Sequence, residues 1–271
     1  MRNINAKRIV VKIGTNVITN AYGTLDSTLM KKLVEQIAKI KNMGKDVIII
    51  TSGAIGAGMK ELQLKARPKD VTLQQVCASI GQHILMSYYQ SLFKKRHIKV
   101  AQILLTSNDF SNKKTFNHLR NSLNKLLELG VIPIINENDP ISIDEIGPSF
   151  GDNDMLSALI TCKIGADLLI ILTDVDGLFD KNPNNKDATL IKEVTNINKK
   201  IKSMGGKPNG LGLGGMKTKI KAAKIATKTS ATVVIANGRK DNVLIKVIKN
   251  EDIGTIFYPE HSKSLNMIWK C

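Results

Sequence analysis

The sequence contains few of the residues that mark several protein classes. Three cysteines are scattered along 271 residues without the paired spacing of a metal site, which fits reduced thiols in the cytoplasm. Aromatic residues make up only 4% of the chain, so isoleucine, leucine and valine must fill the core. Because the paired stacking aromatics of RNA-binding domains are also missing, we expect no nucleic acid partner.

Long apolar segments are absent too. Charged residues stand near the N-terminus and no apolar run of roughly 7–15 residues precedes a cleavage site, so we expect no signal peptide. No stretch approaches about 18 uninterrupted apolar residues, so we expect no association with a membrane. The chain has four histidines and no evident Ser-His-Asp or Cys-His constellation for nucleophilic catalysis.

Positive charge is in clear excess. Against 40 lysines and arginines stand 23 acidic residues, giving a formal net charge of +17. A polyanion partner would account for this charge. However, the lysines alternate with apolar residues as on solvated helix faces, and a phosphorylated small molecule suits the charge equally well. A non-catalytic, basic nucleic-acid-binding protein is therefore one alternative to a phosphate-binding enzyme.

Short runs of isoleucine, leucine and valine alternate with longer segments of helical period. The predicted strands cover residues 8–13, 46–50, 99–105, 131–135, 167–172, 232–236 and 255–257. The predicted helices cover residues 28–42, 73–93, 113–129, 155–163 and 243–249, with others after the turn at 51–58 and ending near 228. Residues 141–146 could form half of a hairpin, and residues 180–209 are polar with turn signals. This alternation predicts an α/β fold with a mainly parallel sheet covered on both faces.

Residues 205–219 are unusually rich in glycine and lead directly into a predicted helix. They hold six of the 20 glycines in fifteen positions. Glycine lets the backbone approach a ligand closely, and the first N–H groups of a helix favour anions, above all phosphate. Lys217 and Lys219 fall in the first helical turn, where a cation opposes the helix dipole unless an anion is present. The stretch does not match a Walker A loop, and a flexible loop before a basic helix is the plainer interpretation.

Further candidate ligand-binding turns lie at or just after the ends of four other predicted strands. They occupy residues 12–14, 52–53, 136–139 and 173–174. In parallel sheets, ligands bind beyond the carboxyl ends of the strands, so these turns predict one site at that edge. Lys12 lies inside a buried strand, which is costly unless its charge meets a partner or a ligand. Alternatively, its side chain reaches solvent at the sheet edge.

Taken in order, these motifs resemble the glutamate 5-kinases of the amino acid kinase superfamily, over residues 8–259. The matching segments are Val-Val-Lys-Ile-Gly-Thr, Thr-Ser-Gly-Ala-Ile-Gly-Ala-Gly, Ile-Asn-Glu-Asn-Asp, Gly-Asp-Asn-Asp-Met-Leu-Ser-Ala, Leu-Thr-Asp-Val-Asp-Gly-Leu and Gly-Leu-Gly-Gly-Met-Lys-Thr-Lys. The resemblance implies a three-layer sandwich in a single amino acid kinase domain at residues 1–260. Its N-terminal part would bind glutamate and its C-terminal part ATP, and a short tail would follow at 261–271.

Two features depart from the family pattern. Members with a fused C-terminal PUA domain are longer, so the resemblance is to the form that lacks this domain. The nucleotide loop commonly carries threonine where this chain has Leu213, which removes a hydroxyl but leaves the backbone cradle.

The implied reaction is ATP-dependent phosphorylation of the γ-carboxylate of L-glutamate, the first step toward proline. A free glutamate side chain titrates near ~4.3, so the nucleophile is already ionised at neutral pH and needs no base. The enzyme must instead hold two anions in line and neutralise the transferred phosphoryl group. Mg²⁺ would travel with the nucleotide, and no protein ligands to a metal are expected.

The resemblance also assigns roles to individual residues. The catalytic residues would be Lys12, Lys219 and Asp154. The two lysines would contact the phosphates from two sides, and Asp154 would orient them, unless it is simply a helix N-cap. Gly14 and Gly53 would offer backbone N–H groups. The substrate contacts would be Ser52, Gly53, Asp139 and Asn153. The nucleotide contacts would be Lys12, Gly14, Thr173, Asp174, Leu213, Gly214, Gly215, Met216, Lys217, Thr218 and Lys219.

The implied partners are L-glutamate, ATP, proline as a feedback inhibitor and further copies of the chain in a dimer or tetramer. A different carboxylate or phosphate kinase of the superfamily, for acetylglutamate, aspartate or a nucleotide, remains an alternative.

Overall fold

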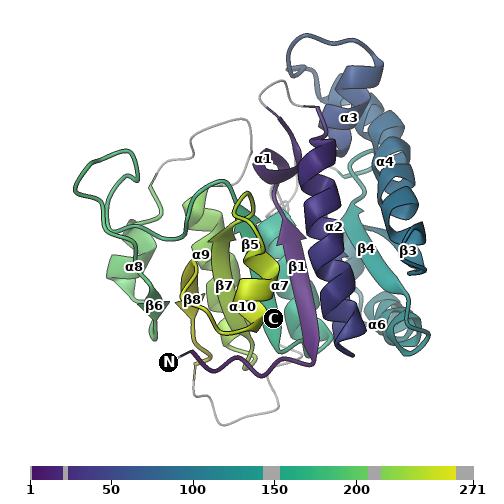
Figure 1. Ribbon diagram of the computed structural model, residues 1–271. Coiled ribbons are helices and arrows are strands. Elements are labelled where there is room, and N and C mark those ends of the chain that lie inside the picture. Colours follow the sequence, from purple (N-terminus) through teal and green to yellow (C-terminus); the bar gives the residue numbers. More distant parts are fainter. Residues whose placement is uncertain (1, 21–23, 143–152, 207–214, 261–271) are drawn as a thin grey trace.

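A computed structural model describes residues 2–20, 24–142, 153–206 and 215–260 of the chain. One sheet of eight strands lies between two layers of helices (Figure 1). The strands are β1 (Arg8–Ile13), β2 (Asp46–Ile50), β3 (Val100–Leu105), β4 (Ile132–Glu137), β5 (Leu168–Thr173), β6 (Glu193–Val194), β7 (Thr232–Asn237) and β8 (Thr255–Phe257). The predicted α/β class with a mainly parallel sheet and helices on both faces is confirmed.

The strand order places β1 near the centre of the sheet. The order is β3-β4-β2-β1-β5-β7-β8-β6, and the first six strands run parallel. Among the eight described strands, β8 alone pairs antiparallel with its neighbour, β7, and β6 then runs parallel to β8. The carboxyl ends of β1, β2, β4 and β5 therefore meet at one edge, because these four strands are contiguous.

Ten helices are present in the described part of the chain. They are α1 (Thr15–Ile18), α2 (Ser27–Asn42), α3 (Ala54–Glu61), α4 (Val71–Lys94), α5 (Asn108–Ser111), α6 (Lys113–Glu128), α7 (Asn153–Lys163), α8 (Lys199–Ser203), α9 (Met216–Thr227) and α10 (Val243–Ile248). Local chemistry defines their ends: Asp26, the N-cap of α2, accepts a hydrogen bond from the Leu29 N–H. None of the described helices is long and apolar enough to cross a membrane.

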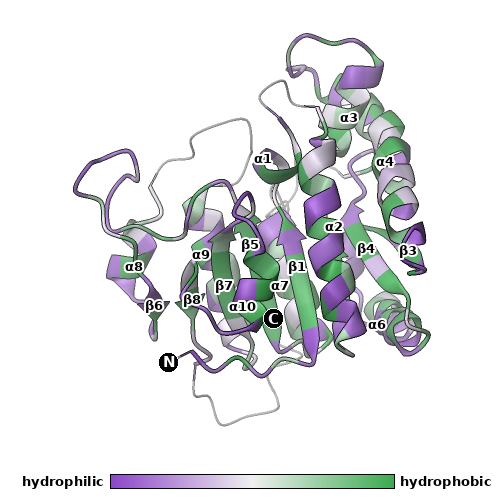
Figure 2. Cartoon of the chain, in the orientation of Figure 1, coloured by the Kyte–Doolittle hydropathy of each residue, from purple (hydrophilic) through white to green (hydrophobic). Residues whose placement is uncertain are grey.

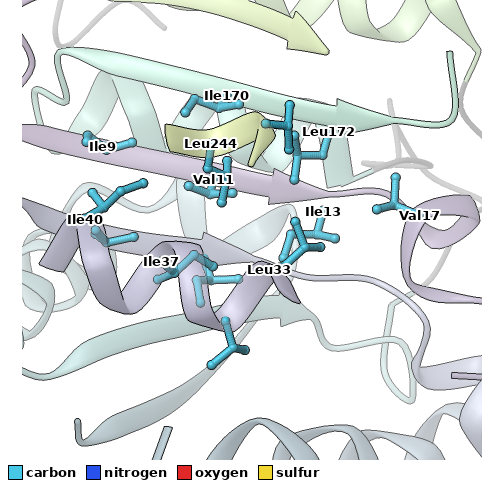
Figure 3. Packing of buried hydrophobic residues seen from close by; sticks show 14 of the residues in the cluster. Ile9, Val11, Ile13, Val17, Leu33, Ile37, Ile40, Ile170, Leu172 and Leu244 are labelled. Carbon is cyan, nitrogen blue, oxygen red and sulfur yellow. The ribbon is translucent and has the colours of Figure 1, made fainter. Parts of the chain in front are cut away.

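Alternate residues of each central strand face opposite helix layers. In β1, Ile9, Val11 and Ile13 contact the layer that contains α2, α4 and α10. Figure 3 shows these side chains meeting Leu33, Ile37 and Ile40 of α2. Burying one such side chain contributes about 1.5–3 kcal/mol, so this contact is a main source of stability.

The other face of the sheet packs against α6, α7 and α9. Val10 belongs to this second cluster, together with Leu156 of α7 and Ile220 of α9. Figure 2 shows the resulting pattern, with hydrophobic residues concentrated in the strands and hydrophilic residues on the outer helix faces. Because side chains alternate along a strand, Lys12 must point to the same face as Val10.

Helices α3 and α4 approach each other unusually closely. A Cβ atom added to Gly58 would lie 1.8 Å from the Cys77 carbonyl oxygen, and one added to Gly81 would lie 1.8 Å from the Ala54 oxygen. Only glycine allows the two backbones to cross at these points. The pair is thereby fixed beside the carboxyl ends of β2 and β4.

The structure differs from the sequence prediction in short or polar elements. The short elements α1, α5, β6 and α8 were not predicted, and β6 and α8 lie in the polar segment 180–209. The strand predicted at 131–135 continues to Glu137, because Asn136 still pairs with Leu104 of β3. Ile141 and Ser142 form a turn closed by hydrogen bonds to Asn138, and the rest of the suggested hairpin lies outside the described residues.

Candidate active site

A cavity of about 1050 Å³ lies at the carboxyl edge of the sheet. The predicted site residues that line it are Lys12, Gly14, Ser52, Gly53, Asp139, Asn153, Thr173, Asp174, Gly215, Met216 and Lys219. Asp154 and Thr218 lie behind this lining, and the Lys217 side chain is exposed. Leu213 and Gly214 lie outside the described residues. The structure thus brings together residues from four strand ends and the start of α9.

The centre of the site is one carboxylate held between two lysines. Lys12 Nζ lies 2.6 Å from Asp154 Oδ1, and Lys219 Nζ lies 3.0 Å from Asp154 Oδ2. The three residues are almost fully buried, with exposed fractions of 2%, 0% and 6% for Lys12, Asp154 and Lys219. The formal charges leave one positive charge in excess, which favours an anion in the adjoining cavity.

The fold explains how these three side chains meet. Strand periodicity turns Lys12 toward α7 and α9, which cross next to each other on that face. Helix α7 begins at Asn153, so Asp154 lies in its first turn rather than at the N-cap. The Thr218 hydroxyl, one residue before Lys219, also donates to Asp154 Oδ2 at 2.8 Å. Both carboxylate oxygens are therefore engaged, and the lysine ammonium groups are held in place.

The start of α9 supplies backbone donors next to these lysines. Gly215 is its N-cap, in extended conformation, and both Gly215 and Met216 line the cavity. The first N–H groups of a helix have no partner within the helix and carry partial positive charge. This segment suits a phosphate group, as the glycine-rich sequence predicts.

Gly14 does not act in the expected way. Its N–H group donates to the Leu172 carbonyl oxygen at 3.2 Å, so it is already used by the neighbouring strand. A Cβ at this position would lie 3.1 Å from the same oxygen and 3.6 Å from Lys12 Nζ. The Gly14 N–H group thus already has a partner in this structure, and the missing side chain leaves space beside Lys12.

A second polar group lies at the ends of β2 and β4. Asn153 Nδ2 is 2.6 Å from the Thr51 carbonyl oxygen, 3.0 Å from Ser52 Oγ and 2.8 Å from Asn136 Oδ1. Gly53, which follows Ser52, has φ of 95° and begins α3. Asp139 lines the same part of the cavity. Neutral donors and the carboxylates of Asp139 and Glu137, which both line the cavity, suit a ligand that carries both an ammonium and carboxylate groups.

Polar contacts also join the turns that follow β1, β5 and β7. Asp174 accepts from Asn16 Nδ2 at 2.9 Å. Burial raises the pKa of Asp176, but hydrogen bonds from Lys240 and Asn237 outweigh it and hold that pKa below its ordinary value. Lys240 Nζ lies 2.6 Å from the Asp176 carboxylate.

Two residues that contact the site residues were not singled out from the sequence, Arg239 and Gln82. Arg239 donates to the carbonyl oxygens of Asn16 and Thr19, both at 2.8 Å, and so ties the turn after β1 to β7. Arg239 lies in the polar turn that follows the strand predicted at 232–236. Examining that turn as a fifth strand end would have identified Arg239. No sequence pattern of this kind marks Gln82, because it lies in the middle of the long helix α4 and not at a strand end.

The fold and the site define a phosphate-handling enzyme, and a family model described as the amino acid kinase family matches residues 7–237. A glutamate 5-kinase from Methanosarcina barkeri is 48% identical over 262 residues, covering 93% of this chain and 68% of the relative. A glutamate 5-kinase from Clostridium acetobutylicum is 45% identical over 259 residues, covering 95% of this chain and 96% of the relative. The chain belongs to the glutamate 5-kinase branch of the amino acid kinase family.

Solved structures agree on the fold. The carbamate kinase from Giardia lamblia bound to AMP-PNP has a TM-score of 0.67 at 16% identity, covering 94% of this chain and 99% of that chain. At this low identity the likeness concerns the fold alone. The resemblance and the three-layer fold implied by the motifs are confirmed.

Proposed function

We propose that the chain transfers the γ-phosphoryl group of ATP to the γ-carboxylate of L-glutamate, giving L-glutamyl 5-phosphate and ADP. One observation carries the mechanism: two buried lysines share Asp154 at the edge of the cavity, in a chain of the glutamate 5-kinase family. A carboxylate oxygen attacks the γ-phosphorus while the bond to the β-phosphate oxygen breaks. No proton moves, so the absence of a base among these residues is consistent with the reaction.

Lys12 and Lys219 carry the electrostatic part of this mechanism. A single charge at ~4 Å contributes roughly 4 kcal/mol at an effective dielectric constant of about 20. Expressed fully in the transition state, that equals about three decades of rate. Asp154 does not touch substrate in this proposal; it holds both ammonium groups where the transferred phosphoryl group must pass.

The two substrates occupy different parts of the cavity in this proposal. Glutamate lies over the N-terminal strand ends, with its α-ammonium at Asp139 and its carboxylates at Ser52 and the Gly53 N–H. Asn153 would orient Ser52 for this contact. ATP lies over the C-terminal part, between Asp174 and the start of α9. We propose this division within one domain at residues 1–260, with a tail at 261–271.

We propose that magnesium enters with the nucleotide and not in a cage made by the protein. Within residues 2–20, 24–142, 153–206 and 215–260, no three His, Cys, Asp or Glu side chains gather as a metal site. Both oxygens of Asp154 already accept hydrogen bonds or ion pairs from its neighbours. We therefore propose that Mg²⁺ is bound by the nucleotide phosphates, whose charge it neutralises.

Three further properties are proposed from the family resemblance. Proline inhibits the enzyme near the glutamate site, the chain assembles into a dimer or tetramer, and it acts in the cytoplasm. Measuring activity with added proline tests the inhibition, and analytical ultracentrifugation tests the assembly. Fractionation of cells that express the tagged chain tests the location.

The reaction is tested by ADP release with Mg²⁺-ATP and by trapping the acyl phosphate with hydroxylamine. L-glutamate, L-aspartate, N-acetylglutamate and UMP are compared as acceptors. Hydroxamate that forms only with L-glutamate supports the proposal. Turnover with another acceptor instead would support the phosphate site but contradict the assignment of L-glutamate as substrate. If no acceptor in the panel causes ADP release, the proposed function is contradicted.

A further inference from the structure

A chain of side-chain amides runs from α4 to the glutamate end of the cavity. Gln82 of α4 accepts a hydrogen bond from Asn136 Nδ2 at 2.8 Å. Asn136 Oδ1 in turn accepts from Asn153 Nδ2 at 2.8 Å, and Asn153 lies 3.0 Å from Ser52 Oγ. This series of hydrogen bonds thus links four different elements, α4, β4, α7 and the turn after β2.

The neighbours of Asn153 determine which atom donates and which accepts in each of these hydrogen bonds. Its Nδ2 atom lies 2.6 Å from the Thr51 carbonyl oxygen, which can only accept, so this atom must be the nitrogen; its two hydrogens are shared among the Thr51 carbonyl, Asn136 Oδ1 and Ser52 Oγ. Asn136 then has only its Nδ2 to offer, and Gln82 must present its oxygen. Because Ser52 Oγ accepts from Asn153, the Ser52 hydroxyl proton is directed to another acceptor, and the cavity lies beside it.

Gln82 lies behind the cavity wall rather than in it. Asn136, Asn153 and Ser52 line the cavity, whereas Gln82 does not and is only 8% exposed. Its Nε2 atom is buried without a hydrogen-bond partner among the described residues. A buried polar atom left unsatisfied is costly, so the position is not explained by stability alone.

The packing of α4 fixes where Gln82 stands. Its neighbour Gly81 touches the Ala54 carbonyl so closely that no Cβ could fit. Two helical turns later, Tyr89 shares a hydrogen bond of 3.0 Å with Thr51, next to Ser52. Helix α4 therefore contacts the ends of both β4 and β2 from one face, and Gln82 cannot shift along the helix axis.

We propose that Gln82 is a positioning residue for the acceptor substrate, acting through Asn136 and Asn153. Its oxygen holds Asn136 in one orientation, which keeps Asn153 donating to Ser52 and the Ser52 hydroxyl turned toward the substrate carboxylate. This inference rests on the proposed function. Without Gln82, Asn136 can flip, and Ser52 can donate to a neighbouring amide instead of glutamate.

The test compares four purified variants with the unmodified enzyme. Gln82→Met removes both polar atoms at similar volume, and Gln82→Asn withdraws the amide by one methylene. Gln82→Glu keeps an oxygen that can accept from Asn136 in either protonation state. Gln90→Met makes the same change at an exposed glutamine of the same helix. KM for glutamate, KM for ATP and kcat are measured for each, and circular dichroism checks folding.

We expect Gln82→Met and Gln82→Asn to raise KM for glutamate by about tenfold, with KM for ATP and kcat changed by less than about threefold. Gln82→Glu and Gln90→Met should stay within about threefold of the unmodified enzyme in all three constants. Equal losses toward both substrates, or no change in KM for glutamate, would overturn the positioning role.

This design distinguishes a failure of the proposed function from a failure of the positioning role. If Gln82→Met does not fold, Gln82→Asn decides the question, since it retains a polar side chain. If the unmodified enzyme shows no glutamate-dependent turnover, the proposed function itself fails and the inference falls with it. If the unmodified enzyme turns over glutamate but the Gln82 variants have an unchanged KM for glutamate, only the positioning role is contradicted.

Discussion

Replacing Asp154 by asparagine should strongly destabilise the protein in the absence of nucleotide. The substitution keeps the shape of the side chain but leaves Lys12 and Lys219 buried without their shared carboxylate. Their exposed fractions are 2% and 6%, so water cannot screen the two charges effectively. Removing one partner of a buried ion pair costs about 3–5 kcal/mol, and here one carboxylate serves two cations.

The assay is urea denaturation followed by circular dichroism, with and without ATP. We expect the free energy of unfolding to fall by about 3–5 kcal/mol without ATP, a large part of a typical 5–15 kcal/mol. ATP should stabilise the variant more than the unmodified protein, because the polyphosphate replaces the lost negative charge. Activity should fall as well, since both lysines lose the group that orients them.

A matched control is the same substitution at Asp241. Asp241 pairs with Lys32 at 2.9 Å, but this pair is exposed, so Asp241→Asn should leave the unfolding midpoint unchanged. The reasoning would be refuted if Asp154→Asn unfolded at the same urea concentration as the unmodified protein without ATP.

Three other outcomes follow from the same structure. Lys12→Ala or Lys219→Ala should lose about two to four decades of kcat while the variants stay folded, as each leaves Asp154 one partner; normal turnover would contradict the roles of the lysines. Gly58→Ala should lower the free energy of unfolding by about 1–3 kcal/mol, because a Cβ would collide with a carbonyl of α4; thermal unfolding checks this. The lowered pKa of Asp176 stabilises the fold above the ordinary value of the carboxyl, and this stability is lost as the pH falls through the lowered value. Asp176→Asn, which leaves Lys240 without the carboxylate, should therefore flatten the rise of stability with pH below about pH 4 in acid titrations.

Much of the fold could be predicted because the strands are buried on both faces. Continuous isoleucine, leucine and valine runs identify β1 and β2 with the observed bounds. The short elements β6 and α8 lack this signal, since they hold two and five residues in a polar segment. Their structure depends on pairing with β8 and packing against α9, which no local pattern reveals.

The candidate site was predictable where residues stand at strand ends and not where they come from elsewhere. Lys12 was conspicuous as a charge inside an apolar strand. Gln82 was not, because its role depends on an amide that lies 54 positions away in sequence. Gly14 shows a further limit: a glycine after a strand predicts close approach, but not whether its N–H group is already used.

The two glycine crossings between α3 and α4 also restrict how the site can move. With no side chain between the backbones at Gly58 and Gly81, neither helix can roll over the other without a backbone collision. The turn at Ser52 is attached to α3, so it cannot be displaced while α4 remains in place. Any displacement of the Ser52 turn would therefore carry α3 and α4 together as one unit.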